Sequence, residues 1–187
     1  MVSTGRHHGF ESLEEAKLLL ALDFAGQVRE LVSQPFRLRF ATLGGAGGHI
    51  PDMLAVTADG TWLFDVRPAG RIRDEDRVKF AAATEVALAC GWRYLLVTGW
   101  ERHVMATLDA FSSRRRPTGD PLGLRDVLVR VAAQGGMSFG ELAAATSAPT
   151  VARAQILHLL WRRRLGIDLA EPLTDATVIS VAGEARP

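Results

Sequence analysis

The sequence has little cysteine and no long apolar run, and each of these absences excludes a class of protein or site. Cys90 is alone among 187 residues, so an intrachain disulfide and a metal site built from several thiolates are excluded. No segment approaches the roughly 18 consecutive apolar residues of a membrane span, and the first residues do not resemble a secretory signal. We therefore expect a cytoplasmic protein without a membrane partner. Cys90 follows an apolar stretch and is expected in the core.

A strong excess of charge of one sign is also missing. The chain has 22 basic and 21 acidic residues, for a net charge of +1, and division at Asp120 leaves neither half strongly basic. Any affinity for nucleic acid must therefore come from local patches of charge. Hydrophobic residues make up 48% and charged residues 23%, which is typical of a globular protein, and the length allows one domain or one with a small appendage.

The first half of the sequence mixes helical and strand patterns. Ser12 followed by Glu15 forms a capping box that predicts a helix over residues 12–24, which Gly26 ends. The other expected elements are strands at 29–35, 36–40, 50–56, 61–66 and 94–98, the last of them buried, a flexible glycine loop at 44–48, and helices at 74–90 and 103–111, the first with an apolar stripe at Val78, Ala81, Ala82 and Val86. This order predicts an α/β fold in which a small mixed sheet is flanked by helices.

The second half reads as a small helical domain behind a linker at 112–121. Three helical patterns, at 122–133, 138–145 and 149–164, precede a strand pair at 167–169 and 177–181. Three helices followed by a β-hairpin is the winged-helix layout. We therefore expect two domains, residues 1–115 and a C-terminal winged helix of residues 116–187 that binds DNA or a partner.

Asp52 and Asp65 are suited to hydrolysing a phosphodiester. Asp52 opens one strand of the expected hairpin, and Asp65 ends the next strand. Because antiparallel neighbours bring the start of one strand near the end of the other, the two carboxylates could hold one divalent metal ion. Such an ion activates water and neutralises charge on the phosphate. Each aspartate alone is equally compatible with turn or surface chemistry.

Glu15 and Arg67 extend this candidate site. At about 100° per residue, Glu15 shares a helix face with leucines and therefore points toward the protein body, while its capping role remains compatible with a metal role. Arg67, two residues after Asp65, lies on the same face of its strand. Arginine stays protonated and cannot serve as a general base, but it can stabilise the charge of the reacting phosphate.

Six short segments in this half form an ordered set. They are Phe10-Glu11-Ser12-Leu13-Glu14-Glu15, Leu22-Asp23-Phe24, Ser33-Gln34-Pro35-Phe36, His49-Ile50-Pro51-Asp52, Asp65-Val66-Arg67-Pro68 and Gly91-Trp92-Arg93-Tyr94. Together they resemble the TnsA-like endonuclease subunit of heteromeric transposases, over residues 5–98.

The resemblance implies a restriction-endonuclease-like fold of the PD-(D/E)xK type that cuts double-stranded DNA at transposon ends with Mg²⁺ or Mn²⁺. It assigns Glu15, Asp52 and Asp65 to the metal, and it places Arg67 where this type usually has a catalytic lysine. It also implies two protein partners, a DDE transposase subunit and an AAA-type ATPase regulator.

Other residues are expected to contact nucleic acid or a partner. Gln34 lies in one of the six segments. Thr150 and Arg153 lie in the first turn of the third helix of the C-terminal half, where a helix-turn-helix protein approaches base edges, and Arg162, Arg163 and Arg164 lie at its far end. The sequence leaves open whether this helix contacts DNA or a protein, and the resemblance favours contact with the ATPase.

Arg67 in place of lysine keeps two alternatives open. One is a catalytically inactive DNA-binding or assembly subunit with the same fold. The other is a different PD-(D/E)xK nuclease, of the restriction or repair type.

Overall fold

The computed structural model describes residues 1, 4–42 and 44–183, and the chain divides into two compact units, Met1–Gly99 and Trp100–Pro187. Helix α3 (Arg102–Ser112) belongs to the second unit, where it packs against α6 (Pro149–Trp161). This boundary lies earlier than the one after residue 115 that the sequence suggested. In the described part of the chain, no helix has the length and apolar character needed to cross a membrane.

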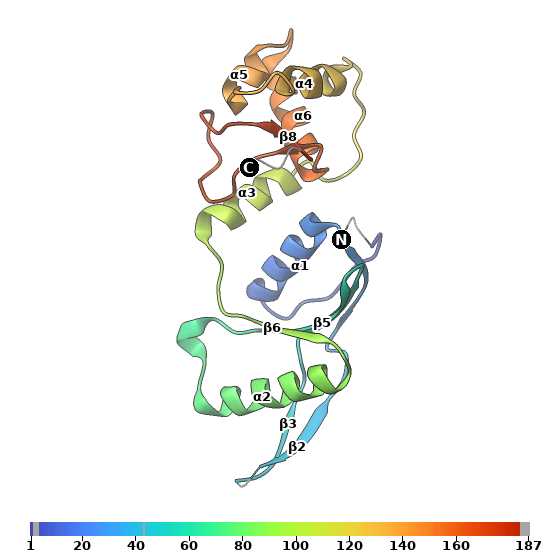
Figure 1. The fold of residues 1–187 in the computed structure, drawn as a ribbon, viewed down its shortest axis with the longest axis vertical. Coiled ribbons are helices and arrows are strands. Elements are labelled where there is room, and N and C mark those ends of the chain that lie inside the picture. Colours follow the sequence, from blue (N-terminus) through green and yellow to red (C-terminus); the bar gives the residue numbers. More distant parts are fainter. Residues whose placement is uncertain (2–3, 43, 184–187) are drawn as a thin grey trace. The chain divides into compact units, whose positions relative to one another are not determined.

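The first unit is a mixed sheet flanked by helices, as the sequence predicted. Its elements are α1 (Leu13–Ala25), β1 (Val28–Ser33), β2 (Leu38–Thr42), β3 (Gly45–His49), β4 (Met53–Thr57), β5 (Gly60–Val66), the short 3₁₀ turn η1 (Ala69–Arg71), α2 (Asp74–Ala89) and β6 (Arg93–Val97). The sheet has the order β1-β4-β5-β6, with β5 and β6 parallel and the other neighbours antiparallel. Figure 1 shows α1 and α2 on opposite faces of this sheet.

The ends of α1 follow from the local sequence. The Ser12 hydroxyl accepts a hydrogen bond from the Glu15 amide at 3.2 Å, which satisfies one of the unpaired amides of the first turn. Gly26 ends the helix with a φ of 67°, a left-handed conformation that glycine adopts without steric cost. The predicted helix and both of its ends are confirmed.

The face of α2 that packs on the sheet differs from the predicted stripe. Asp76, Ala83 and Ala87 are its buried residues, whereas Val78 is 43% exposed. The two alanines pack in a core with Leu38 and Leu63, joined by the partly buried Phe36, Leu54, Val86, Trp92 and Tyr94. Of the predicted stripe, Val86 packs against this core, whereas Val78 and Ala81 are exposed, because the buried face of α2 also carries Asp76.

Three other expectations for this unit are wrong. Cys90 is exposed rather than in the core. Strand β6 is not uniformly buried, since Leu95 is 44% exposed. The glycine-rich segment is not a flexible loop but strand β3, which pairs with β2 in a separate hairpin. An added Cβ at Gly47 would lie 2.5 Å from the Phe40 ring, so glycine here makes room for a side chain rather than for flexibility.

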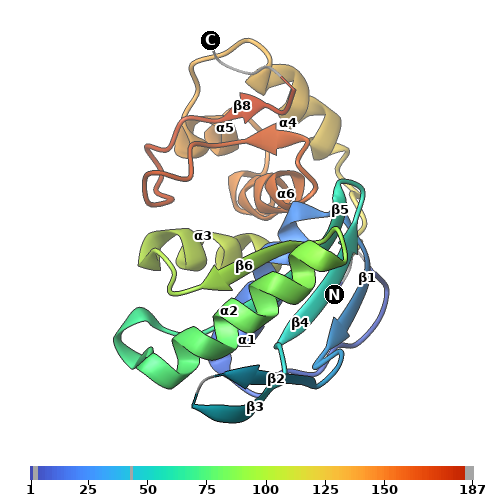
Figure 2. The ribbon, with the colours of Figure 1, turned by 60° about the horizontal axis from the view of Figure 1, so that its bottom comes forward.

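The second unit is mainly helical. Besides α3 and α6 it contains α4 (Leu124–Ala132), α5 (Phe139–Ala144), β7 (Leu165–Gly166) and β8 (Ser180–Val181), which are visible in Figure 2. The three predicted helices after the linker are present. The strand pair is shorter than expected, because Leu165 and Gly166 pair with Val181 and Ser180, while residues 167–169 lie outside any strand. Its core includes Leu128, Leu142, Ile156 and Leu159.

Candidate functional site

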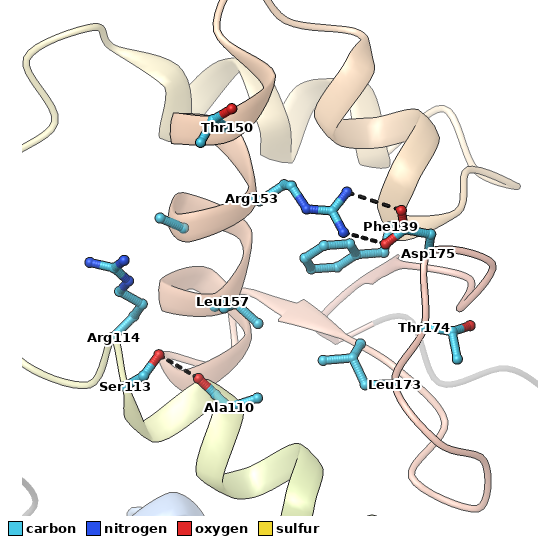
Figure 3. Close-up of a pocket in the computed structure, with 11 residues that line it drawn as sticks. Ala110, Ser113, Arg114, Phe139, Thr150, Arg153, Leu157, Leu173, Thr174 and Asp175 are labelled. Atoms are coloured by element: carbon cyan, nitrogen blue, oxygen red, sulfur yellow. Dashed lines mark hydrogen bonds and ion pairs between the residues drawn. The ribbon is translucent and has the colours of Figure 1, made fainter.

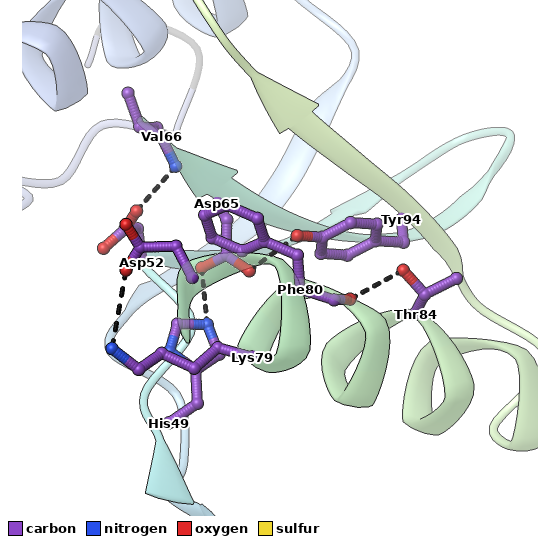
Figure 4. Close-up of polar contacts among 9 residues, drawn as sticks. His49, Asp52, Asp65, Val66, Lys79, Phe80, Thr84 and Tyr94 are labelled. Atoms are coloured by element: carbon purple, nitrogen blue, oxygen red, sulfur yellow. Dashed lines mark hydrogen bonds and ion pairs between the residues drawn. The ribbon is translucent and has the colours of Figure 1, made fainter. Parts of the chain in front are cut away.

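The strand register brings Asp52 beside Asp65. Met53 pairs with Phe64 across β4 and β5, and the Asp52 amide donates to the Phe64 carbonyl at 3.1 Å. The Asp52 side chain reaches over to β5, where Oδ2 accepts a hydrogen bond from the Val66 amide at 2.7 Å (Figure 4). Two carboxylates therefore lie at the same end of this strand pair, as the sequence predicted.

Asp65 is held through both of its oxygens. Oδ1 accepts a hydrogen bond from His49 Nε2 at 2.9 Å, and Oδ2 accepts one from the Tyr94 hydroxyl at 2.8 Å (Figure 4). The carboxylate is buried, with 1% of the residue exposed. Burial and the neighbouring Asp65 charge raise the pKa of Tyr94, so this hydroxyl remains a donor at neutral pH. The edge of the His49 ring faces the Phe80 ring, with 6.2 Å between centroids.

Asp52 is electrostatically strained. Burial, together with the nearby charges of Asp65 and Glu15, raises its pKa to about 6, against the opposing effects of the hydrogen bond from Val66 and the proximity of His49. Like charges gathered in a partly buried position favour the binding of a proton or another cation. This is the property expected of a cation site.

Glu15 contributes charge but serves the helix cap. Its Oε2 accepts from the Glu11 amide at 2.9 Å, and its Oε1 accepts from the Ser12 hydroxyl at 2.8 Å. Among the described residues, no group of three or more His, Cys, Asp or Glu side chains is arranged to hold a metal ion. The structure brings together Asp52 and Asp65, while the expected meeting of three carboxylates is not seen.

The pair of aspartates fits a hard divalent cation. Oδ1 of Asp52 accepts no hydrogen bond from any described residue, and each oxygen of Asp65 has a second lone pair beyond the one its donor uses. Mg²⁺ typically binds one or two carboxylates and keeps several waters. The residues that would hold such an ion are Asp52, through Oδ1, and Asp65, through its remaining lone pairs.

Arg67 lies in a separate ion cluster. Its Nη2 is 3.4 Å from Oδ2 of Asp76, and Lys79 Nζ is 3.4 Å from Oδ1 of the same carboxylate. A hydrogen bond from the Arg73 amide, together with the Arg67 and Lys79 charges, lowers the pKa of Asp76. Arg67 is thus drawn toward the first turn of α2, and its buried Nε has no partner among the described residues.

Sequence reasoning missed the residues that support the aspartates. Tyr94 is the single tyrosine of the chain, yet its strand pattern gave it only a packing role. His49, which the sequence places in one of the six segments without a role of its own, donates to Asp65. In the sequence, Asp76 and Lys79 are indistinguishable from ordinary surface residues near the start of a helix. Strand alternation could have placed Tyr94 on the same face as Asp65 once the β5–β6 register was known, but His49 lies in the separate β2–β3 hairpin, which no register relates to β5.

The contact residues expected elsewhere fall in different settings. Gln34 is exposed and adopts a φ of 50°, which is uncommon for a residue other than glycine, and its amide donates to the Asp52 carbonyl at 2.9 Å. It therefore lies beside the aspartates. In the second unit, Arg162, Arg163 and Arg164 are exposed, and Arg164 lies 3.4 Å from Asp126.

Thr150 and Arg153 line a pocket of the second unit (Figure 3). Arg153 forms an ion pair with Asp175 and stacks over the Phe139 ring, 4.9 Å from its centroid. Its guanidinium is already engaged within the domain. Thr150 is exposed at the start of α6.

Comparison of the sequence with protein families finds no family model that matches, and comparison with curated proteins finds no match.

Proposed function

We propose that the unit Met1–Gly99 is a metal-dependent DNA endonuclease of the restriction-endonuclease-like type, and that the chain is the TnsA-like subunit of a heteromeric transposase. The observation that carries the proposal is the pairing of Asp52 with Asp65 at the end of the β4–β5 hairpin, with the raised pKa of Asp52. Two carboxylates placed together in a partly buried position repel each other, and a bound cation would relieve that repulsion.

The order of elements supports the same proposal. Helix α1, the antiparallel β4–β5 hairpin, helix α2 and the parallel strand β6 follow in this order along the chain. The two carboxylates lie at the open end of the hairpin, opposite its turn. The resemblance in the sequence implies this arrangement. The second unit is proposed to contain a winged helix, formed by α4, α5, α6 and the short strand pair β7–β8.

The roles of the residues follow from their chemistry. A Mg²⁺ or Mn²⁺ ion held by Asp52 and Asp65 would supply an activated water and positive charge next to the phosphate. Tyr94 and His49 fix the Asp65 carboxylate through both oxygens. Arg67 is assigned to neutralising charge on the phosphate rather than to removing a proton, because its guanidinium stays protonated.

A second candidate is an inactive DNA-binding or assembly subunit. Two observations favour it: Arg67 pairs with Asp76, and Glu15 uses both carboxylate oxygens at the helix cap. For either candidate the proposed partners are duplex DNA at transposon ends, a DDE transposase and an AAA-type ATPase, with the second unit as the site of ATPase contact.

A nicking assay tests the enzyme proposal. Full-length protein is incubated with supercoiled plasmid and either Mg²⁺, Mn²⁺ or EDTA, with and without the transposase subunit. We expect metal-dependent nicking that Asp52→Ala and Asp65→Asn abolish. The matched control is Asp59→Ala, which removes an exposed carboxylate in the β4–β5 turn and should leave nicking intact.

The outcomes separate the two candidates. Nicking by Asp52→Ala at the wild-type rate would remove the aspartate pair from the chemistry. Tight DNA binding without nicking under any metal or partner condition would instead favour the inactive subunit.

A further inference from the structure

The β2–β3 hairpin presents a flat face that carries arginines. Leu38 packs in the core with Ala83 and Ala87 of α2, and side chains alternate along a strand, so Arg39 points to the opposite face. Arg37 precedes β2 and lies on the same face as Arg39, since its Nε is 3.6 Å from the position that a Cβ of Gly48 would take. The partner strand is Gly45–His49, in which no residue before His49 is larger than alanine. We call this outer surface, formed by Arg37, Arg39, Ala41, Ala46 and Gly48, the arginine face.

Two glycines of β3 have different roles. Gly47 lies under the Phe40 ring on the inner face, where an added Cβ would clash at 2.5 Å. Gly48 pairs with Arg39 on the arginine face, and an added Cβ there would lie 3.6 Å from Arg37 Nε. Core packing therefore explains Gly47 but not Gly48. What Gly48 provides is a smooth surface beside two guanidinium groups.

The charges of the arginine face have no acidic partner in the part of the chain that the structure describes. Arg37 and Arg39 are both exposed, and neither forms an ion pair with an acidic residue in the described ranges. Arg6, by contrast, lies 2.8 Å from Glu30. In a chain with a net charge of only +1, such a pair of free cations is the kind of local patch that an anionic polymer requires.

The hairpin is also connected to the aspartate site. Strand β3 ends at His49, whose Nε2 donates to Asp65 at 2.9 Å. Figure 1 shows the hairpin projecting from the unit beyond α2. A ligand bound along the ribbon is thus held at a fixed distance from Asp52 and Asp65.

We propose that the arginine face binds the phosphate backbone of duplex DNA and positions it for the aspartates; the inference rests on the proposed function and names its DNA-binding surface. A two-stranded ribbon fits the major groove, which is about 12 Å wide. Arginine offers a planar fork that matches phosphate oxygens. Glycine and alanine opposite the arginines let the ribbon approach the duplex closely.

The salt dependence of DNA binding tests the proposal. Full-length protein and a fluorescent duplex are titrated in EDTA at several salt concentrations. Each phosphate contact contributes about 0.9 to the slope of log K against log salt. Arg37→Ala/Arg39→Ala should therefore lower the slope by about 1.8, while Arg37→Lys/Arg39→Lys should keep most of it because the charges remain. The control Arg93→Ala removes a cation that stacks on Trp62 and should leave the slope unchanged.

A second pair of variants tests the surface without removing an arginine. Ala46→Glu adds a carboxylate to the arginine face and should weaken binding. Ala58→Glu adds the same charge in the β4–β5 turn and should have a smaller effect. Both alanines are exposed, so neither change disturbs the core.

The results also separate this inference from the proposed function. An unchanged slope in the double alanine variant, or no duplex binding by the wild type, would overturn the arginine face. Metal-dependent nicking with an unchanged slope would overturn the arginine face alone. Binding that depends on Arg37 and Arg39 without nicking would support the arginine face and remove the enzyme proposal.

Discussion

The two units bury polar side chains in opposite ways. In the first unit, Asp52 and Asp65 bring like charges together, and the pKa of Asp52 rises to about 6. In the second, Gln155 accepts from Arg125 Nε at 2.7 Å and donates to the Gly119 carbonyl at 3.3 Å, while His158 donates to the Arg114 carbonyl at 2.7 Å. The hydrogen bonds of Gln155 and His158 stabilise the fold, whereas the repulsion between Asp52 and Asp65 makes this pair the candidate for function.

The charge states follow the same division. Burial lowers the pKa of His158, so its hydrogen bond to the linker carbonyl is made by a neutral ring and costs little to bury. Asp52 remains ionised at pH 7 although burial and two carboxylates oppose it. Replacing residues of the two kinds should therefore have opposite effects on stability and activity, and four predictions follow from the largest effect to the smallest.

Outside the aspartate pair, the largest effect is expected at Arg67. Arg67→Ala should lower the nicking rate by about 10²–10³, the usual cost of losing one group that stabilises transition-state charge, with little loss of DNA affinity. Arg67→Lys should retain part of the rate because it keeps the charge. The matched control is Arg71→Ala, an exposed arginine in η1. Wild-type nicking by Arg67→Ala would make Arg67 a structural partner of Asp76.

The features that the sequence predicted correctly are the local ones, namely the ends of α1 and the β4–β5 hairpin. Ser12 and Gly26 mark the ends of α1, and the turn before Gly60 fixes the register that places Asp52 beside Asp65. Both follow from neighbouring residues, since caps and tight turns act over a few positions.

The support of the site was not predictable in this way. Tyr94 lies 29 positions after Asp65 and His49 lies 16 before it, so their hydrogen bonds depend on how three strands and α2 come together. The same holds for Arg67, which a strand pattern places beside Asp65 but which an acidic residue of α2, Asp76, attracts. These contacts depend on packing across the sheet, which cannot be predicted from the spacing of nearby residues in the sequence.

Asp52 should make stability fall as pH rises. Its folded pKa is about 6, above the ordinary value of 3.8, so the folded state holds this proton more tightly than the unfolded state. The contribution of Asp52 to the free energy of unfolding is therefore largest below about pH 4. It is lost as the pH rises through about 6, and the total loss is at most about 3 kcal/mol. Asp52→Asn should remove that loss.

Urea unfolding in EDTA at pH 4.5 and pH 8 measures the effect. We expect Asp52→Asn to be more stable than the wild type at pH 8 and to differ less at pH 4.5, while nicking is lost. Asp59→Asn, in the exposed turn, is the control for the general effect of one fewer charge. A less stable Asp52→Asn variant at pH 8 would mean that this carboxylate stabilises the fold.

Gln155 should behave in the opposite sense. Gln155→Ala leaves the Arg125 guanidinium and the Gly119 carbonyl without this partner in a largely buried position. We expect a loss of about 1–3 kcal/mol in the free energy of unfolding and an unchanged nicking rate at temperatures where the variant is folded. Gln134→Ala, at an exposed glutamine after α4, should change stability little. Equal unfolding midpoints for the two variants would contradict the structural role of Gln155.

The smallest effect is expected at Arg153, which could both stabilise the second unit and contact a partner. Its guanidinium pairs with Asp175 and stacks on Phe139, but the pair is largely exposed and such pairs contribute less than about 1 kcal/mol. Arg153→Ala should therefore barely shift the unfolding midpoint.

If Arg153 only holds residues 173–175 against α6, Arg153→Ala should also leave partner binding unchanged. If the second unit docks the ATPase through this pocket, affinity for that partner should fall in Arg153→Ala, while Arg130→Ala, at an exposed position in the last turn of α4, should not change it. Calorimetry of the full-length variants with the ATPase distinguishes these outcomes, because a loss of affinity without a loss of stability cannot come from the ion pair alone.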